Sequence, residues 1–569
     1  MSSNASILLS LVMPTEAISR RDRAAGCLVA ILHVAALIIM VVTEGDVVAK
    51  AAFALVWALL NCFWLALFRR PLVAALMSLE FVIALTLLSR FKYDKLWMTV
   101  DFVDLMIIDQ DTSAFLLTAF PSLRGWIVLA AMGTVALLIA AWRLDPARVQ
   151  VRTSLVGGLL SVIALAALSL SFPTDLHEDF ISGNYVSKFA RTGVEAIHEL
   201  AAHGILQSDV SVTESLPAAP TAICHPPHKL PHIILLHDES SFDITVAPAI
   251  EVPPGYHRHF QSLDGKARKL VVEGVGGPSW FTEFNVLTGL SVRSFGRFAT
   301  SVTRIAAGRV SRGLPHSLSR CGYKTFSLYP FHGAFLGSRA FQKTAGIAHY
   351  LDMPDLGTRG FEADRFYFDR AVEIIQRERG GGPLFLYVYT VANHFPWDTR
   401  LRPELTPGWR DLGNAPDLDE YIRRQAMTAH DYRELLDRLA NEFPTESFLI
   451  VRYGDHQPQF GARVIDPSLG KEALARRLEA SDPRYFTTYY AIDAVNFAPA
   501  DLSSALDTLD APYLPLIIQE AAGVPLGPSF SEQKRILQRC HGLFYRCADG
   551  AEARRFNRLL IEAGLVNGL

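Results

Sequence analysis

The stretch Phe448-Leu449-Ile450-Val451-Arg452-Tyr453-Gly454-Asp455-His456 predicts a buried β-strand that ends in half of a metal site. Its apolar run is continuous over four residues, which favours a strand inside a parallel sheet. Asp455 and His456 at its end bring a carboxylate oxygen and an imidazole nitrogen to one point. Because a lone Asp-His pair is common in loops, the prediction depends on a second group of ligands.

A second predicted strand supplies that group. His232-Ile233-Ile234-Leu235-Leu236 has the same continuous apolar character, and Asp238-Glu239-Ser240 follows it. In open α/β sheets, ligands bind outside the carboxyl ends of the strands. We therefore expect the two strand ends to converge on one cation.

A glycine-rich segment with a hydroxyl group lies between them in the sequence. Residues 274–284 are Gly-Val-Gly-Gly-Pro-Ser-Trp-Phe-Thr-Glu-Phe, and they follow a predicted strand over Leu270-Val271-Val272. The glycines permit a tight turn whose backbone amides can face an anion. Ser279 is then expected at the start of a helix, where its hydroxyl needs a base or a cation to become a nucleophile.

The first third of the 569-residue chain is strongly apolar and is predicted to cross a membrane five times. Arginines precede the first run and lie between the second and third and between the fourth and fifth, which places the N-terminus in the cytoplasm and everything after about Pro173 outside. The first run has no convincing cleavage site, so we expect a retained anchor. The five runs are Ala25–Val42, Ala51–Phe68, Leu72–Ser89, Trp126–Trp142 and Leu155–Phe172.

Two features of the membrane region have alternative interpretations. Glu80 lies inside the third run, where an ionisable group is a functional candidate; a protonated Glu80 bonded to Asn61 or His33 would be structural, and we favour that interpretation. The segment Trp97–Phe120 alternates apolar and acidic residues. It is predicted either as an amphipathic element at the outer interface or as a loop helix packed on the bundle.

The charge of the chain argues against one class of partner, and its cysteines indicate where disulfides can form. The net charge is −3 and the soluble part has no long basic run, which argues against nucleic acid as a partner. Cys27 and Cys62 fall inside membrane runs. The other four, Cys224, Cys321, Cys540 and Cys547, lie where disulfides are permitted, and of their three possible pairings the local bridge Cys540–Cys547 is favoured.

From Pro231 onward, predicted strands and helices alternate, which favours a mostly parallel sheet covered by helices on both faces. Strands are predicted at 270–272, 324–328, 384–389, 448–453 and 514–518, and helices at 368–379, 421–443, 533–545 and 551–565. The predicted domains are a five-helix transmembrane domain (1–174), a juxtamembrane linker (175–228), a catalytic α/β domain (229–525) and a C-terminal helical segment (526–569).

Together these motifs resemble the alkaline phosphatase and sulfatase superfamily. The resemblance rests on Glu239-Ser240 after a strand, on Ser279 four positions before Glu283-Phe284, and on Gly454-Asp455-His456. With five membrane runs in front, the chain is most similar to the lipoteichoic acid synthase-like phosphoglycerol transferase group. The resemblance implies that Glu239, Ser279, Asp455 and His456 bind Mn²⁺ or Zn²⁺ and that Ser279 is also the nucleophile. The synthases typically have threonine at that position, which carries the same hydroxyl group.

The resemblance also implies substrate contacts. His394, in Asn393-His394-Phe395-Pro396, matches a phosphate-contacting histidine, and His332 and Arg339 match a head-group loop. That loop is shorter here and lacks the aromatic residue that the synthases place before the arginine. The sulfatase frame Cys-x-Pro-x-Arg has its nearest match at Cys224-His225-Pro226-Pro227-His228, which lacks the arginine and is rejected.

These expectations predict a metal-dependent phosphotransferase anchored in the inner membrane with its catalytic domain in the periplasm. It would move phosphoglycerol from phosphatidylglycerol to a periplasmic glucan or another envelope glycan through a covalent Ser279 intermediate. The first alternative is a phosphoethanolamine transferase acting on lipid A or a glycan. A phosphodiesterase or phosphomonoesterase that uses water, and a non-catalytic receptor or assembly factor, are further alternatives.

Overall fold

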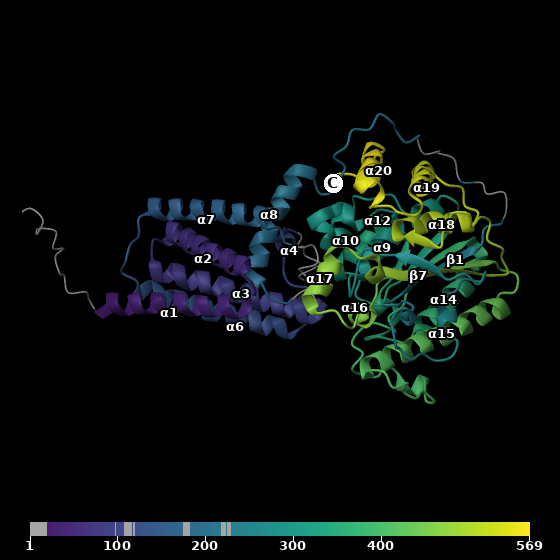
Figure 1. Cartoon of the computed structure of the whole chain (residues 1–569), viewed down its shortest axis with the longest axis horizontal. Helices are drawn as coiled ribbons and strands as arrows, with labels where there is room; N and C mark the ends of the chain where they lie inside the picture. Colours follow the sequence, from purple (N-terminus) through teal and green to yellow (C-terminus); the bar gives the residue numbers. More distant parts are fainter. Residues whose placement is uncertain are drawn as a thin grey trace, which may run out of the picture. The chain divides into compact units, whose positions relative to one another are not determined.

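The computed structural model of the protein describes residues 20–96, 98–106, 116–117, 120–174, 182–217, 224 and 229–569. The chain divides into two compact units (Figure 1). One comprises Met1–Phe102 and Ala119–Glu195, and the other comprises Val103–Thr118 and Ala196–Leu569.

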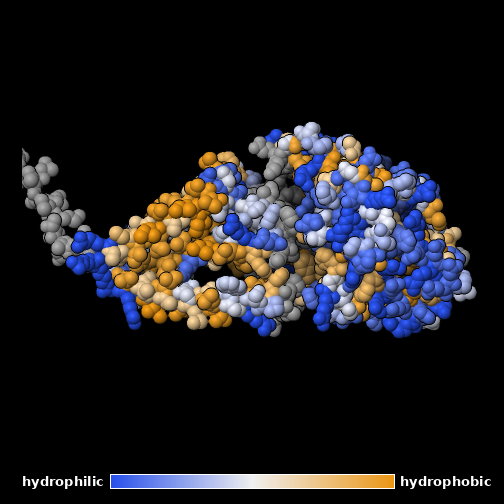
Figure 2. Space-filling view, turned by 90° about the horizontal axis from the view of Figure 1, so that it is seen from below, coloured by the Kyte–Doolittle hydropathy of each residue, from blue (hydrophilic) through white to orange (hydrophobic). Residues whose placement is uncertain are grey.

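The first unit contains five helices that are long and apolar enough to cross a membrane, as predicted. Figure 2 shows apolar side chains covering these helices, and residues such as Val42, Met132 and Leu160 are more than half exposed. A helix with apolar side chains on all sides suits a lipid environment. These are the features of a multi-pass membrane protein with a separate globular domain. The helices are α1 (Arg20–Thr43), α2 (Val47–Phe68), α3 (Pro71–Leu96), α6 (Ser122–Leu144) and α7 (Val151–Ser171).

The partners predicted for Glu80 are engaged elsewhere. Asn61 donates to the carbonyl oxygen of Trp57 at 2.8 Å, and the indole nitrogen of Trp57 donates to Nδ1 of His33 at 3.0 Å. Oε1 of Glu80 is buried and makes no hydrogen bond to any residue that the structure describes. The predicted pairing is therefore wrong for this oxygen, since no hydrogen bond joins it to Asn61 or His33.

Helices also form in the segments beside the membrane spans. α4 (Phe102–Met106) lies in the predicted amphipathic segment, whose described residues are 98–106, 116–117 and 120; Trp97 and residues 107–115 and 118–119 lie outside the described residues. The predicted juxtamembrane linker contains α8 (Tyr185–His203). Its apolar residues Val186, Phe189 and Val194 recur at helical spacing and pack against the membrane helices, a pattern that the surrounding polar residues obscure.

The second unit is built on one eight-stranded sheet with the order β4-β3-β5-β1-β6-β7-β2-β8. The first five strands of that order are parallel, whereas β7 is antiparallel to both β6 and β2. Strands β1, β5 and β6 are buried along their whole length, which explains their continuous apolar sequences. The strands are β1 (His232–Asp238), β2 (Arg268–Val271), β3 (Lys324–Leu328), β4 (His349–Leu351), β5 (Leu384–Tyr389), β6 (Phe448–Gly454), β7 (Thr487–Val495) and β8 (Thr508–Asp510).

Helices cover both faces of this sheet, as predicted (Figure 1). α14 (Asp364–Glu378) and α15 (Pro416–Glu442) lie on one face, and α9 (Ser279–Thr288), α12 (Ser338–Thr344) and α18 (Leu514–Ala521) lie on the other. The C-terminal segment forms α19 (Pro528–Cys540) and α20 (Ala551–Glu562). Shorter helices are α10 (Val302–Ala306), α11 (Leu314–Ser319), α13 (Met353–Leu356), α16 (Gly461–Ile465) and α17 (Lys471–Glu479).

The strand predicted at 514–518 is wrong, since these residues form the first turns of α18. Every residue of this helix is buried, and 514–518 are apolar without interruption, so periodicity does not distinguish this segment from a buried strand. Pro515 marks the first helical turn, where proline is tolerated.

Two disulfides stabilise the second unit. Cys540 pairs with Cys547, as favoured from the sequence, and Cys224 pairs with Cys321 across 97 residues. Cys27 and Cys62 are free.

Candidate metal centre and active site

Strand register brings the predicted ligands together. Within the sheet, Asp238 of β1 lies opposite Gly454 of β6. The next residues, Glu239 and Asp455, therefore leave the carboxyl edge of the sheet side by side. Ser279 is the first residue of α9, so its side chain is at the start of a helix, as predicted.

The four predicted ligands form one buried group. Oγ of Ser279 lies 3.1 Å from Oε2 of Glu239 and 3.1 Å from Nε2 of His456. Nε2 of His456 lies 3.6 Å from Oε1 of Glu239 and 3.3 Å from Oδ2 of Asp455. All four side chains are almost completely buried. The structure therefore places a hydroxyl group among two carboxylates and an imidazole.

The protonation of this group fits a divalent cation. Nδ1 of His456 lies 2.9 Å from the carbonyl oxygen of Gln457, which can only accept, so Nδ1 donates and Nε2 is the nitrogen that faces the other candidate ligands. Oδ2 of Asp455 is buried without a hydrogen bond among the described residues. Burial alone would raise the pKa of Asp455, but His456 and His237 outweigh it and hold that pKa well below its usual value. The ionised oxygens and the imidazole nitrogen suit Zn²⁺ or Mn²⁺.

His237 is a member of this group that the sequence analysis missed. Its Nε2 lies 3.1 Å from Oδ2 of Asp455, and ligand atoms of His237, Glu239 and Asp455 all lie within 4.8 Å of one another. Its Nδ1 is 2.9 Å from the hydroxyl of Tyr387 and 2.8 Å from that of Tyr453. The available signal was a histidine two residues before Glu239, inside an otherwise apolar strand.

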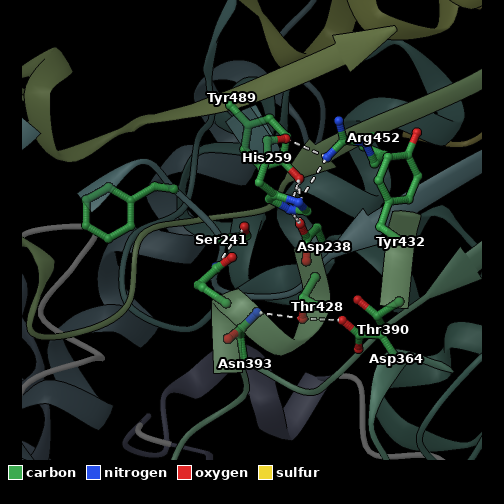
Figure 3. A network of polar contacts seen from close by, with 12 residues as sticks. Asp238, Ser241, His259, Asp364, Thr390, Asn393, Thr428, Tyr432, Arg452 and Tyr489 are labelled. Atoms are coloured by element: carbon green, nitrogen blue, oxygen red, sulfur yellow. Dashed lines mark hydrogen bonds and ion pairs between the residues drawn. The ribbon is translucent and has the colours of Figure 1, made fainter. Parts of the chain in front are cut away.

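Asp238, the neighbour of His237 in β1, faces a different set of partners (Figure 3). Successive side chains of a strand point to opposite faces. Oδ2 of Asp238 accepts from Nε2 of His259 at 2.9 Å and also from the hydroxyl of Tyr489. Arg452 donates to the carbonyl oxygen of His259 at 2.6 Å and lies 4.0 Å from the centre of the Tyr432 ring. Burial lowers the pKa of His259, so its neutral ring donates to Asp238 and fixes the end of β1.

His394 lies in the loop that follows β5. Its Nδ1 is 2.7 Å from the carbonyl oxygen of Phe395, so Nδ1 donates and Nε2 of the neutral ring presents a lone pair. Arg424 of α15 holds the loop, because it donates to the carbonyl oxygens of His394 at 2.8 Å and of Pro396 at 2.7 Å. The geometry of His394 is thus set by backbone contacts on both sides.

Arg339 of α12 is paired with two carboxylates that the sequence analysis did not identify. Its Nη2 lies 2.7 Å from Oδ2 of Asp352 and 3.3 Å from Oδ2 of Asp355. Asp352 also accepts from the backbone nitrogen of Gly333 at 2.8 Å. His332 precedes this glycine in the loop after β3, so both predicted head-group residues belong to one loop-and-helix segment.

Glu283 connects that segment to the nucleophile helix. It is buried one turn after Ser279, and its Oε1 accepts from Ser338 at 3.2 Å and from Gln342 at 2.9 Å. Ser338 is the neighbour of Arg339. Burial raises the pKa of Glu283 to about 7, although its two hydrogen bonds oppose the shift.

A mostly parallel sheet with acidic, imidazole and hydroxyl groups at its carboxyl edge defines an α/β domain suited to metal-assisted chemistry at a hydroxyl group. Residues 278–484 match the family model for sulfatases. This segment of the chain therefore carries a sulfatase domain. The matched segment includes every predicted site residue except Glu239, which precedes it.

Solved structures with similar folds include three transferases or synthases. Streptococcus pyogenes phosphoglycerol transferase GacH, solved with sn-glycerol-1-phosphate, is 15% identical over 60% of this chain and 87% of its own, with a TM-score of 0.46. Neisseria meningitidis lipooligosaccharide phosphoethanolamine transferase A is 11% identical over 84% and 96%, with a TM-score of 0.41. Listeria monocytogenes lipoteichoic acid synthase LtaP is 14% identical over 52% and 73%, with a TM-score of 0.38. No curated protein matches the sequence.

Proposed function

We propose that this protein is a membrane-bound phosphotransferase that moves phosphoglycerol from phosphatidylglycerol to a periplasmic glucan or another envelope glycan. One observation carries the proposal: the hydroxyl of Ser279 lies 3.1 Å from both Glu239 and His456, inside the group of candidate ligands. A nucleophile in this position forms a covalent intermediate, whereas a receptor with the same fold has no need of it.

In the first half-reaction, the hydroxyl of Ser279 gives its proton to Oε2 of Glu239, to which it donates at 3.1 Å, as Oγ attacks the phosphorus of the lipid donor. A divalent cation held by Glu239, Asp455 and His456 would lower the pKa of the Ser279 hydroxyl and offset negative charge on the phosphoryl oxygens. The bond between phosphorus and the diacylglycerol oxygen breaks, and protonated His394 gives that oxygen its Nε2 proton. Phosphoglycerol remains on Ser279.

In the second half-reaction, a hydroxyl group of the acceptor takes the place of diacylglycerol. The lone pair at Nε2 of His394 accepts the proton of that hydroxyl, whose oxygen attacks phosphorus and releases Ser279. Oγ of Ser279 then regains its proton from Glu239. His394 thus gives a proton in one step and regains it in the next. Ping-pong kinetics are expected.

Head-group recognition is assigned to His332 and to Arg339 with its carboxylates. Arg339 can donate to glycerol hydroxyls, and Asp355, whose side chain is 44% exposed, can accept from them. The same carboxylate could pair with an ammonium group, which supports phosphatidylethanolamine as the alternative donor.

The proposed location is the inner membrane, with the α/β domain in the periplasm. Arginines before α1 and between α2 and α3 support a cytoplasmic N-terminus, and the two disulfides support an oxidising compartment for the globular unit. Within that unit we assign catalysis to 229–525, joined to the membrane domain (1–174) through 175–228 and capped by the helices of 526–569.

Peptide mass spectrometry of the full-length protein in detergent tests the proposal. The protein, loaded with Mn²⁺ or Zn²⁺, is incubated separately with phosphatidylglycerol and phosphatidylethanolamine. We expect a phosphoglycerol adduct on the Ser279 peptide, its loss in Ser279→Ala, and its retention in Ser279→Thr, which keeps the hydroxyl. A phosphoethanolamine adduct there would favour the alternative donor. Metal-loaded protein without either adduct would contradict a lipid-derived covalent intermediate.

A further inference from the structure

Three half-buried phenylalanines lie around His394, and a fourth adjoins one of them. The ring centre of His394 lies 4.3 Å from that of Phe395, 4.7 Å from that of Phe361 and 5.7 Å from that of Phe331. Phe335 adjoins Phe331 at 5.7 Å. Each of these five rings retains some solvent-accessible surface. We call Phe331, Phe335, Phe361 and Phe395 the aromatic wall.

The aromatic wall is continuous with the candidate metal centre. The ring centre of Phe331 lies 5.9 Å from that of Tyr389, at the end of β5. The hydroxyl of Tyr389 donates to Oε2 of Glu239 at 3.1 Å. One tyrosine ring therefore separates the wall from a carboxylate that also bonds Ser279.

The charged groups beside the wall are already engaged with one another. Glu362, which follows Phe361, pairs with Arg402 at 2.5 Å, and Arg339 pairs with Asp352 at 2.7 Å. The four phenylalanine side chains of the wall have no hydrogen-bonding atom, whereas the adjacent His394 offers Nε2. Partly accessible apolar surface beside a polar site is typical of a ligand pocket, in which a few polar groups orient an otherwise apolar ligand.

The position of His394 identifies which part of a substrate would meet these rings. In the proposed reaction, Nε2 of His394 protonates the leaving oxygen, so the two atoms must come within hydrogen-bond reach. Whatever is bonded to that oxygen must then lie against the rings around His394. In the lipid donor this is the diacylglycerol part, whose ester and acyl groups suit an aromatic surface better than the hydroxylated head group does.

We propose that the aromatic wall is a subsite for the diacylglycerol part of the lipid donor. This inference rests on the proposed function, and it identifies the part of the donor that the enzyme binds while the phosphorus–oxygen bond breaks. Recognition of the lipid anchor would then fall to the wall, of which Phe331 and Phe335 flank His332 in the head-group loop.

A comparison of a lipid donor with its deacylated form tests the proposal. The double variant Phe335→Ala/Phe361→Ala leaves His394 and the ligands intact. In the full-length protein in mixed micelles, we expect its kcat/KM to fall at least tenfold toward phosphatidylglycerol and to stay within twofold toward glycerophosphoglycerol. Phe366→Ala is the matched control, because Phe366 is a half-buried phenylalanine on α14 that packs on Tyr367 outside the wall.

The other outcomes overturn the inference. Equal losses toward both donors would show that the wall only shapes the catalytic loop, and a change confined to the KM of the glycan would assign the wall to the acceptor. Unchanged kinetics would exclude a binding role. Wild-type protein inactive toward both donors would instead contradict the proposed function itself.

A second measurement needs no variant. Wild-type protein is irradiated with phosphatidylglycerol that carries a diazirine on an acyl chain close to the ester. We expect labelling of the peptides that carry Phe335 and Phe361, suppressed by unlabelled phosphatidylglycerol but not by glycerophosphoglycerol at the same concentration. Labelling confined to the membrane helices would overturn the subsite.

Discussion

At the scale of single residues, His237 is placed to orient a metal ligand. It lies between the hydroxyls of Tyr387 and Tyr453 on one side and Asp455, at 3.1 Å, on the other. Its ring stacks on Tyr389, with centres 3.7 Å apart. A carboxylate that is held by a buried histidine loses little freedom when it binds a cation, and such supporting contacts affect metal affinity strongly.

We therefore predict that His237→Ala lowers the affinity for Zn²⁺ or Mn²⁺ by about 10- to 100-fold. Isothermal titration of the chelator-treated full-length protein would measure the loss. His349→Ala is the control, since His349 is an exposed histidine that stacks on Phe326 at the edge strand. Equal affinities of the His237→Ala and wild-type proteins would assign His237 to packing alone.

Local sequence was enough to predict some site residues and not others. Glu239, Asp455 and His456 directly follow apolar strands, and Ser279 follows a glycine-rich turn, so adjacent residues indicate both position and chemistry. Asp352 and Asp355 meet Arg339 only because α12, β4 and α13 fold against one another. Such pairings depend on tertiary contacts, which a motif does not contain.

At the scale of elements, one carboxyl group links the nucleophile helix to the head-group segment. Glu283 of α9 bonds Ser338 and Gln342 of α12, and the hydroxyl of Tyr350 in β4 donates to Ser338 at 3.2 Å. Ser279 and Arg339 are thus held apart by a short, buried connection. We expect this connection to set the distance between the attacking oxygen and the bound head group.

Replacing Glu283 should therefore affect donor use more than folding. We predict that Glu283→Ala lowers kcat/KM for the lipid donor by about tenfold, mainly through KM, because a buried hydrogen-bonded link is lost. Glu283→Gln should stay within about threefold of wild type, since its amide oxygen still accepts from Gln342. Steady-state kinetics over a range of donor concentrations would separate the two constants.

Glu283→Gln distinguishes two roles of Glu283: one that requires its ionisable group, and one in which its hydrogen bonds position the head group. If Glu283→Gln loses as much activity as Glu283→Ala while both melt like the wild type, the ionisable group itself is required. If neither variant changes KM, the link between α9 and α12 does not position the head group.

The same contrast between local and long-range information applies to whole elements. β1, β5 and β6 were predicted because complete burial makes their sequences continuously apolar. β7 was missed, since Thr487, Thr488 and Asp493 interrupt its apolar residues and its antiparallel pairing with β6 leaves no local signal. α18 was predicted as a strand because burial on all sides removes the helical period.

At the scale of the whole molecule, a buried carboxyl group makes stability depend on pH. Asp364 begins α14 and is completely buried; it accepts from the backbone nitrogen of Ala392 at 3.2 Å and from the hydroxyl of Thr428 in α15 (Figure 3). Burial, with repulsion from Asp238 and Asp431, raises the pKa of Asp364 from 3.8 to about 8, and the hydrogen bonds oppose the shift only in part.

The sign of the effect follows from which state holds the proton. Between pH 3.8 and about 8, the folded protein keeps Asp364 protonated while the unfolded chain has released the proton. The free energy of unfolding must then fall as the pH rises, and the fall ends above pH 8, where both states are ionised. Between pH 6 and pH 8 the loss amounts to about 2 kcal/mol.

We predict that the full-length protein in detergent melts at a lower temperature at pH 8 than at pH 6, and that Asp364→Asn removes part of this difference. The amide has no proton to release, so the contribution of residue 364 becomes independent of pH. Asp411→Asn should leave the slope between pH 6 and pH 8 unchanged, because Asp411 is exposed and its hydrogen bonds from Arg400 hold its pKa below its usual value. Melting curves at fixed metal concentration across this range would measure the slopes. Equal slopes for wild type and Asp364→Asn would mean that Asp364 is ionised in the folded protein at pH 6, with Thr428 and Ala392 stabilising its charge despite burial.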